Sequence, residues 1–196
     1  MIISVIFLAI TLALVIYIVS IYNNLVTLFN RAYNAFSQID VQLKRRYDLI
    51  PNLVTIAQKY LSHEENTLIK VTMARNNALN ASSNANLKNA KSLQDLSEAQ
   101  NSLNSALSNF NMVLENYPNL KANENLTQLS KELTHTENKI AFARQAYNDS
   151  VMHYNTARES FPANLIVQYF PKFRENLIML EFEDKQEISK TPKVNF

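Results

Sequence analysis

The chain contains no glycine in its 196 residues, and this absence narrows the folds that it can adopt. Tight hairpin turns, phosphate-binding loops and dinucleotide-binding fingerprints depend on glycine, because glycine enters left-handed backbone conformations without steric cost. The composition therefore argues against a β-sandwich, a P-loop enzyme and a Rossmann enzyme. The chain also lacks cysteine, which excludes disulfides, thiolate zinc sites and a lipid-modified cysteine anchor. Its net charge of +2 creates no strong field, so we expect no nucleic-acid partner.

The first 30 residues carry no charged side chain. About 20 apolar residues, at roughly 1.5 Å each, span the roughly 30 Å hydrocarbon core of a bilayer. A cleaved signal peptide is the alternative, but the segment has no basic start and no small-residue cleavage site. We therefore predict that residues 1–20 form a single-pass transmembrane anchor, with the membrane bilayer as a partner. Among nearby residues only Arg31 is basic, which favours an outside N-terminus and a cytoplasmic domain.

The rest of the chain shows the apolar spacing of packed helices. Apolar residues recur every three or four positions, and no window of comparable length alternates with period two. One such stripe begins at Leu25 and runs through Ile39, Leu43, Tyr47 and Ile50. Similar stripes cover residues 96–117 and 129–154. The pattern predicts an all-α protein in which coiled-coil-like seams hold the helices together.

Proline and asparagine divide this region into four predicted helices, at about 20–48, 51–79, 86–117 and 120–160. Pro51 is either a break or a kink, because the apolar spacing continues almost unchanged through it. A helix from 20 to 79 would be roughly 90 Å long, with half of it unpartnered, so we prefer a turn with Asp48 as N-cap. The predicted architecture is an antiparallel up-and-down four-helix bundle over residues 21–175, following the anchor.

In this arrangement the fourth helix returns to the membrane. The aromatic segment 161–173 then either closes the base of the core or lies in the lipid headgroup region. Residues 176–196 are charged and aperiodic, and we expect a disordered tail. Tyr147-Asn148 and Tyr154-Asn155 repeat after seven residues, and we interpret the two asparagines as setting the register of the helices.

Several long motifs make the chain resemble the LemA family. They are SQIDVQLKRRYDLIPNLV at 37–54, Ala74-Arg75, YPNLKANEN at 117–125, ENKI at 137–140 and FPAN at 161–164. The match extends from about residue 20 to residue 170. The resemblance implies a bacterial membrane protein with a LemA-like four-helix bundle. It implies no catalytic residues, because the family has no agreed activity.

A charge cluster in the first predicted helix comprises Asp40, Lys44, Arg45, Arg46 and Asp48. The cluster lies about 24 residues beyond the anchor, or roughly 36 Å along a straight helix. Screening in physiological salt acts over about 8 Å, so lipid phosphates are out of reach. The basic residues therefore either pair with Asp40 and Asp48 at helical spacing or face a protein partner.

The pair Glu132 and His135 has the Glu-x-x-His spacing of di-iron bundles, but the second such motif is missing. We assign no catalytic, cofactor-binding or metal-binding residues, and no small-molecule substrate is evident. The sequence favours a non-enzymatic, membrane-anchored interaction or scaffold protein whose protein partner is unidentified and could be a second copy. Two alternatives stay open: a metal- or ligand-dependent activity near Glu132 and His135, and an envelope sensor or adaptor.

Overall fold

The computed structural model describes residues 2–61 and 64–181, and this part of the chain forms helices and no strands. The prediction of an all-α protein is confirmed over these residues. The long helices are α1 (Ile2–Gln58), α2 (Glu65–Ser83), α3 (Ala90–Glu115) and α5 (Glu124–Glu159). Two single-turn helices, α4 (Pro118–Lys121) and α6 (Ala163–Ile166), precede and follow α5. The 3-10 turns η1 (Val167–Tyr169) and η2 (Pro171–Phe173) complete the elements.

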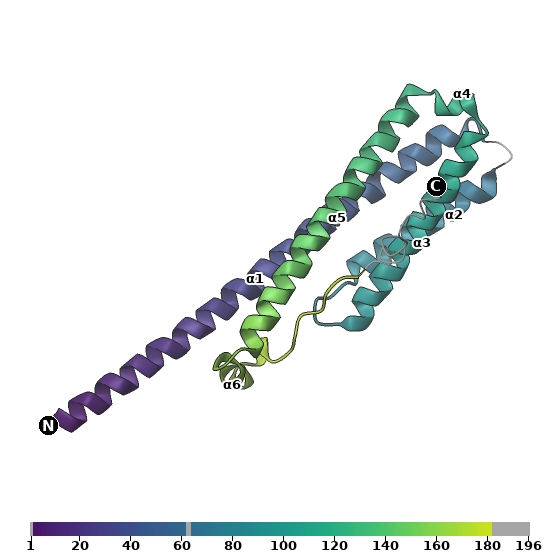
Figure 1. The fold of residues 1–196 in the computed structure, drawn as a ribbon. Coiled ribbons are helices and arrows are strands. Elements are labelled where there is room, and N and C mark those ends of the chain that lie inside the picture. Colours follow the sequence, from purple (N-terminus) through teal and green to yellow (C-terminus); the bar gives the residue numbers. More distant parts are fainter. Residues whose placement is uncertain (1, 62–63, 182–196) are drawn as a thin grey trace, which may run out of the picture.

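The helices pack as two pairs, and the N-terminal part of α1 projects away from the rest (Figure 1). α1 lies against α5, α2 lies against α3, and α1 also contacts α2. The projecting part contains an 18-residue window with a mean hydropathy of 3.0, none of which is buried. An apolar core helix would bury such a window, so its exposure points to a membrane-associated segment.

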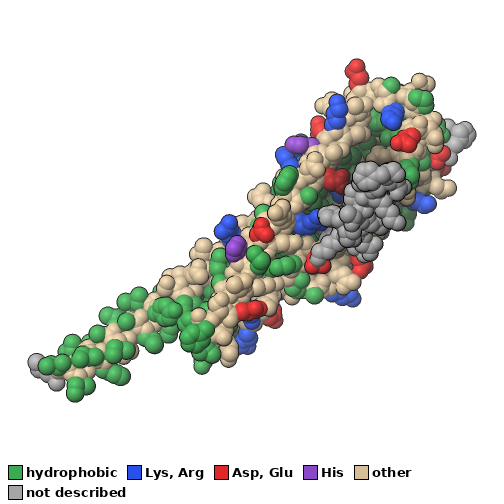
Figure 2. All heavy atoms as spheres, viewed as in Figure 1, with side chains coloured by type: hydrophobic (Ala, Val, Ile, Leu, Met, Phe, Trp, Pro, Cys, Tyr) green, Lys and Arg blue, Asp and Glu red, His purple; other side chains and the backbone are tan. Residues whose placement is uncertain are grey.

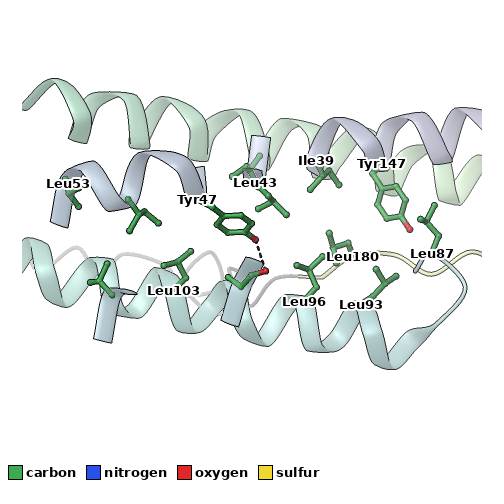
Figure 3. Packing of buried hydrophobic residues seen from close by; sticks show 14 of the residues in the cluster. Ile39, Leu43, Tyr47, Leu53, Leu87, Leu93, Leu96, Leu103, Tyr147 and Leu180 are labelled. Atoms are coloured by element: carbon green, nitrogen blue, oxygen red, sulfur yellow. Dashed lines mark hydrogen bonds between the residues drawn. The ribbon is translucent and has the colours of Figure 1, made fainter. Parts of the chain in front are cut away.

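The core follows the predicted seams closely. Along α1, Leu25, Ala32, Ile39, Leu43 and Tyr47 are all buried. Figure 3 shows how Ile39, Leu43, Tyr47 and Leu53 of α1 face Leu93, Leu96 and Leu103 of α3. The partners that α5 supplies to this core include Ile140, Tyr147, Val151 and Tyr154.

Asparagine side chains cap the starts of two long helices, α3 and α5. The side chain of Asn89 accepts a hydrogen bond from the Ser92 amide, and that of Asn123 accepts one from the Leu126 amide. Each satisfies one of the amide groups left without a partner at a helix start. No residue in the described part of the chain has a positive φ, as expected without glycine.

The predicted turn at Pro51 is wrong, because α1 continues through Pro51 to Gln58. The break falls instead between α1 and α2, and Asp48 lies inside α1 rather than at an N-cap. A proline inside a helix lacks the amide that would bond to the carbonyl four residues earlier, here the carbonyl of Tyr47. Arg75 of α2 fills this gap, because its Nε donates to the Tyr47 carbonyl oxygen at 3.0 Å. A side chain from another helix therefore satisfies the carbonyl that Pro51 leaves without its usual donor.

The C-terminal segment fulfils one of its two predicted roles but differs from the predicted tail. Residues 161–173 close the base of the core with Ala163, Val167 and Phe173, which are buried. We call residues 174–181 the C-terminal strap. Part of the strap falls within the predicted disordered tail, yet Leu177 and Leu180 are 2% and 1% exposed. The remaining residues of that predicted tail, 182–196, lie outside the described residues.

The Arg75 contact yields a stability prediction. Arg75→Met keeps much of the side-chain volume but removes the donor to the Tyr47 carbonyl. We expect the free energy of unfolding to fall by about 1–3 kcal/mol, because a charged hydrogen bond is lost and a buried carbonyl is left unsatisfied. Urea unfolding of the full chain in detergent micelles, followed by circular dichroism, measures the change.

Pro51→Ala supplies the missing amide and serves as the matched control. Added to Arg75→Met, it should recover part of the lost stability, because the Tyr47 carbonyl regains a donor within α1. If Pro51→Ala changes the stability of the native and Arg75→Met proteins equally, the two residues are not coupled through this carbonyl.

Candidate functional site

The predicted charge cluster does not act as one unit, because the structure divides it between two sides of α1. Arg46 faces inward and is 4% exposed, whereas Lys44, Arg45 and Asp48 are exposed. The ion pairs of Arg45 and Arg46 reach α5, not Asp40 or Asp48 on the same helix. The intrahelical pairing that the spacing suggested is therefore not the arrangement observed.

Arg46 is the centre of a polar layer inside the helices. Its Nη2 donates to Asn104 Oδ1 of α3 at 2.6 Å and lies 3.9 Å from Glu137 Oε1 of α5. Burial lowers the pKa of the Arg46 guanidinium, and the nearby Glu137 carboxylate opposes this effect. One buried cation thus connects α1, α3 and α5.

Tyr47, the residue after Arg46, connects α1 to α2 and α3 by hydrogen bonds. Its hydroxyl donates to the Ala78 carbonyl of α2 at 3.1 Å, the bond drawn as a dashed line in Figure 3. The same hydroxyl accepts a hydrogen bond from Gln100 Nε2 of α3. Burial raises the pKa of the Tyr47 hydroxyl to about 12, so the phenol stays neutral at any physiological pH. Together with the Arg75 bond to its carbonyl, Tyr47 makes polar contacts with two other helices.

A small cavity of about 50 Å³ adjoins the polar layer, between α3 and α5. Arg46, Gln100, Asn104 and Glu137 are among its lining residues. Within the described residues, Arg46 Nε and Gln100 Oε1 are buried and have no hydrogen-bond partner. One is a donor and the other an acceptor, and a polar cavity of this size suits a buried water molecule. The arrangement provides hydrogen bonds that fix the helices.

The exposed half of the cluster borders a larger cleft. Asp40 and Lys44 line a cleft of about 540 Å³ between α1, α2 and the connection from α2 to α3. Asp40 accepts a hydrogen bond from Ser82 Oγ at 3.0 Å. Arg45 lies outside the cleft, 3.9 Å from Glu132, in a surface ion pair of the kind that contributes about 0–1 kcal/mol. Asp40 and Lys44 are thus the members of the cluster that line this cleft.

The alternative metal site near Glu132 and His135 receives no further ligands in the structure. Glu132 is paired with Arg45, and His135 is exposed on α5. In residues 2–61 and 64–181, no group of three or more His, Cys, Asp or Glu side chains is placed to hold a metal ion. The pair by itself supplies two of the four or more ligands that a bundle metal site uses.

Asn148 and Asn155 hold the C-terminal strap. The sequence had led us to interpret them instead as residues that set the register between helices. Asn148 donates to the Leu180 carbonyl at 3.1 Å and accepts from the Leu180 amide at 2.9 Å. Asn155 makes the same pair of bonds to Leu177, at 2.8 and 3.0 Å. Seven residues of helix rise roughly 10.5 Å, and three residues of extended chain cover roughly 10 Å. The seven-residue spacing of Asn148 and Asn155 along α5 therefore equals the spacing of Leu177 and Leu180 along the extended strap, and the two asparagines bond to the strap rather than to another helix.

Further bonds tie the strap to both neighbouring helices. The hydroxyl of Tyr147 donates to the Ile178 carbonyl at 2.6 Å, and the Ile178 amide donates to the Leu87 carbonyl at 3.3 Å. Ser97 of α3 donates to the Glu181 carbonyl. Burial raises the pKa of Tyr147, which remains a hydrogen-bond donor. The strap thus fills the space between α5 and α3 next to the polar layer.

The asparagine pair yields a second prediction. Asn148→Ala and Asn155→Ala each remove two hydrogen bonds to one strap residue and leave a backbone amide and carbonyl without their partners. We expect each change to expose the bonds after Lys172 and Arg174, so that trypsin cuts there faster than in the native chain. Mass spectrometry of a digestion time course on the full chain measures the rate.

Asn138→Ala, at an exposed position of α5, is the matched control and should leave this cleavage unchanged. Equal cleavage in all three variants would show that the asparagines do not hold the strap.

With this geometry established, comparison with known proteins identifies the family. A curated relative, described as magnetosome protein MamQ of Magnetospirillum gryphiswaldense, is 25% identical over 158 residues. The match covers 72% of this chain and 58% of the relative, so the chain matches little more than half of that protein. The model of the LemA family matches residues 35–196, which contain the polar layer, the strap and the cleft residues Asp40 and Lys44. The chain therefore belongs to the LemA family.

Proposed function

We propose that this protein is a non-enzymatic, membrane-anchored interaction protein, in which a helical domain is held at the bilayer surface to bind another protein. The observation that carries the proposal is the single helix α1. Its exposed apolar part and its core-forming part belong to one uninterrupted helix, Ile2–Gln58. Because no linker separates them, the orientation of the domain follows from that of the anchor.

We also infer that α1, α2, α3 and α5 act as one antiparallel bundle of the up-and-down type. The pairing of α1 with α5, of α2 with α3, and of α1 with α2 supports this inference. The contacts of Tyr47 and Arg46 link all four helices at one level. A domain joined in this way behaves as a rigid body, as a scaffold requires.

The distribution of basic residues supports a cytoplasmic domain with the N-terminus outside. The sequence offered Arg31 alone, but folding brings Lys88 and Lys172 to the membrane end of the domain. Their Nζ atoms lie 5.6 and 5.0 Å from the ring centroid of Phe29 on α1. Cytoplasmic segments next to a span carry an excess of Lys and Arg within about 15–20 residues of it, so Arg31 carries the orientation argument. Lys88 and Lys172 suit the anionic lipids of the cytoplasmic leaflet once the domain has folded.

We assign the partner-binding surface to the cleft that Asp40 and Lys44 line. Tyr33 borders the same cleft and is 56% exposed, so the surface combines an aromatic ring with charges of both signs. Protein interfaces favour such aromatic residues, and charges at the rim favour particular partners. A second copy of the chain is one candidate partner. The similarity to a magnetosome protein supports a place at a membrane and names no partner.

A single-cysteine experiment tests the surface and the orientation together, because the native chain has no cysteine. Ser83→Cys places a thiol at the rim of the cleft, and Gln145→Cys places one on the exposed side of α5 as the control. We expect a cysteine–amine crosslinker that crosses membranes to give a discrete adduct from Ser83→Cys in intact cells, and none from Gln145→Cys. The adduct should disappear when Asp40→Lys and Lys44→Glu are added, with the fold checked by circular dichroism.

Three results would contradict parts of this proposal. An adduct with an impermeant crosslinker in intact cells would place the domain outside. Equal adducts from both cysteine positions would show that the cleft has no preferred neighbour. An adduct that survives both charge reversals would place the contact away from Asp40 and Lys44.

A further inference from the structure

The segment that closes the base of the domain has a second, outward face. While Ala163, Val167 and Phe173 are buried, Phe161, Leu165 and Tyr169 are 80%, 54% and 83% exposed. We call these three exposed residues the basal face. Phe161 lies in the turn before α6, Leu165 in α6 and Tyr169 in η1, so all three come from the short segment that closes the base. Exposed apolar side chains gathered in this way mark a surface that another phase or protein covers.

The basal face lies at the height where the exposed apolar part of α1 ends. That exposed apolar run extends to Val19. Three residues later, the ring of Tyr22 packs on Phe170 and Phe173, which belong to the segment that carries the basal face. The ring centroids are 4.9 and 5.4 Å apart. Three residues of helix rise roughly 4.5 Å. The headgroup region adds roughly 5–8 Å on each side of the hydrocarbon core, so the segment falls within it.

Basic residues surround this end of the domain. Lys172 Nζ lies 5.0 Å from the ring of Phe29 and 5.6 Å from that of Phe173, and Lys88 Nζ donates to the Lys172 carbonyl at 3.0 Å. Arg174 is exposed, while Arg158 donates to the carbonyls of Phe173 and Arg174. Two acidic side chains also lie in this region. Glu159 is held by Asn176 and lies 3.9 Å from Arg158, and Glu175 is exposed. The basic residues outnumber the acidic ones, which suits lipid phosphates.

We propose that the basal face inserts into the headgroup region of the bilayer that holds α1, so that the domain docks on its own membrane. Aromatic rings are favoured at the boundary between hydrocarbon and water, and Tyr169 can keep its hydroxyl among the lipid headgroups. Figure 2 shows hydrophobic side chains along the projecting part of α1 and again at the adjoining end of the domain. This continuity favours a lipid surface over a second copy or another protein. The inference rests on the membrane anchor of the proposed function.

The native chain has no tryptophan, so single tryptophans report on this contact without background. We would place one at Phe161 or at Tyr169 in the full chain and reconstitute it in phosphatidylcholine–phosphatidylglycerol vesicles with brominated acyl chains. Ile10→Trp lies in the exposed apolar run and is the positive control. Phe142→Trp, at a position 73% exposed on α5, is the matched control in the domain. Circular dichroism checks the fold of each variant.

Bromine quenches tryptophans that lie close to the acyl chains. We expect quenching to be strongest for Ile10→Trp, intermediate for Phe161→Trp and Tyr169→Trp, and absent for Phe142→Trp. The two basal tryptophans should also emit at shorter wavelength in vesicles than the Phe142→Trp protein does.

The controls separate failure of this inference from failure of the anchor. Quenching at Ile10 without quenching at positions 161 and 169 would overturn the basal contact and leave the anchor intact. No quenching at Ile10 would overturn the anchor itself, and the basal contact with it. If the basal tryptophans escape both brominated lipid and soluble acrylamide, a protein surface covers them and the lipid contact is wrong.

Discussion

The missing amide at Pro51 is the constraint on which the rest of this structure depends. A proline at this position would end or sharply bend a helix unless another donor reached the Tyr47 carbonyl. Arg75 is that donor, and it comes from α2. The Tyr47 carbonyl is therefore satisfied by a tertiary contact, which forms when α2 folds back onto α1. Because α1 both projects toward the membrane and forms the core, this one contact links the position of the domain to its fold.

The interior polar groups serve the same end of fixing helices relative to one another. Arg46 and Tyr47 bond to side chains or carbonyls on α2, α3 and α5 at one level of α1. Asn148 and Asn155 hold the strap by its backbone with two hydrogen bonds each, and Tyr147 is a third residue of the same helix that bonds to the strap. An apolar seam alone permits helices to slide, whereas buried polar contacts are satisfied in one register. These polar contacts thus fix α2, α3 and α5 relative to α1, the helix that continues into the exposed apolar part.

The sequence predicted the helical class, the apolar seams and the family from local patterns that persist in the fold. It placed the helix break at Pro51 because one helix over residues 20–79 would have been half unpartnered, whereas the helix ends at Gln58. The guanidinium that compensates for Pro51 lies 24 residues further along the chain, and no local pattern indicates it. Gln100 was missed as a core residue because the seams were predicted from apolar residues, and Gln100 is a polar residue that is 2% exposed. The asparagines at heptad spacing were noticed but matched to a helix. Their partner is an extended segment, whose rise per residue is about twice that of a helix.

The candidate site illustrates the same limit. The five charged residues at 40–48 lie close in sequence, but the turn of α1 sends Arg46 inward and leaves Asp40 and Lys44 at a cleft. Glu137 and Asn104 complete the polar layer from α5 and α3, and no spacing in the sequence connects them to Arg46. Local patterns can predict which face of a helix is polar. They do not predict which distant residue meets it.

The central claim is that α1 is one helix through Pro51, and a distance between two spin labels tests it most directly. Asn34→Cys and Gln58→Cys place labels at two exposed positions of a chain without native cysteine. Separated by 24 residues of continuous helix, the labels should lie roughly 36 Å apart in pulsed electron paramagnetic resonance of the reconstituted protein. A turn at Pro51 would fold the two segments against each other and bring the labels to roughly 18 Å, given helix axes 8–10 Å apart. The longer distance is the one that this structure predicts, and the shorter one would contradict it.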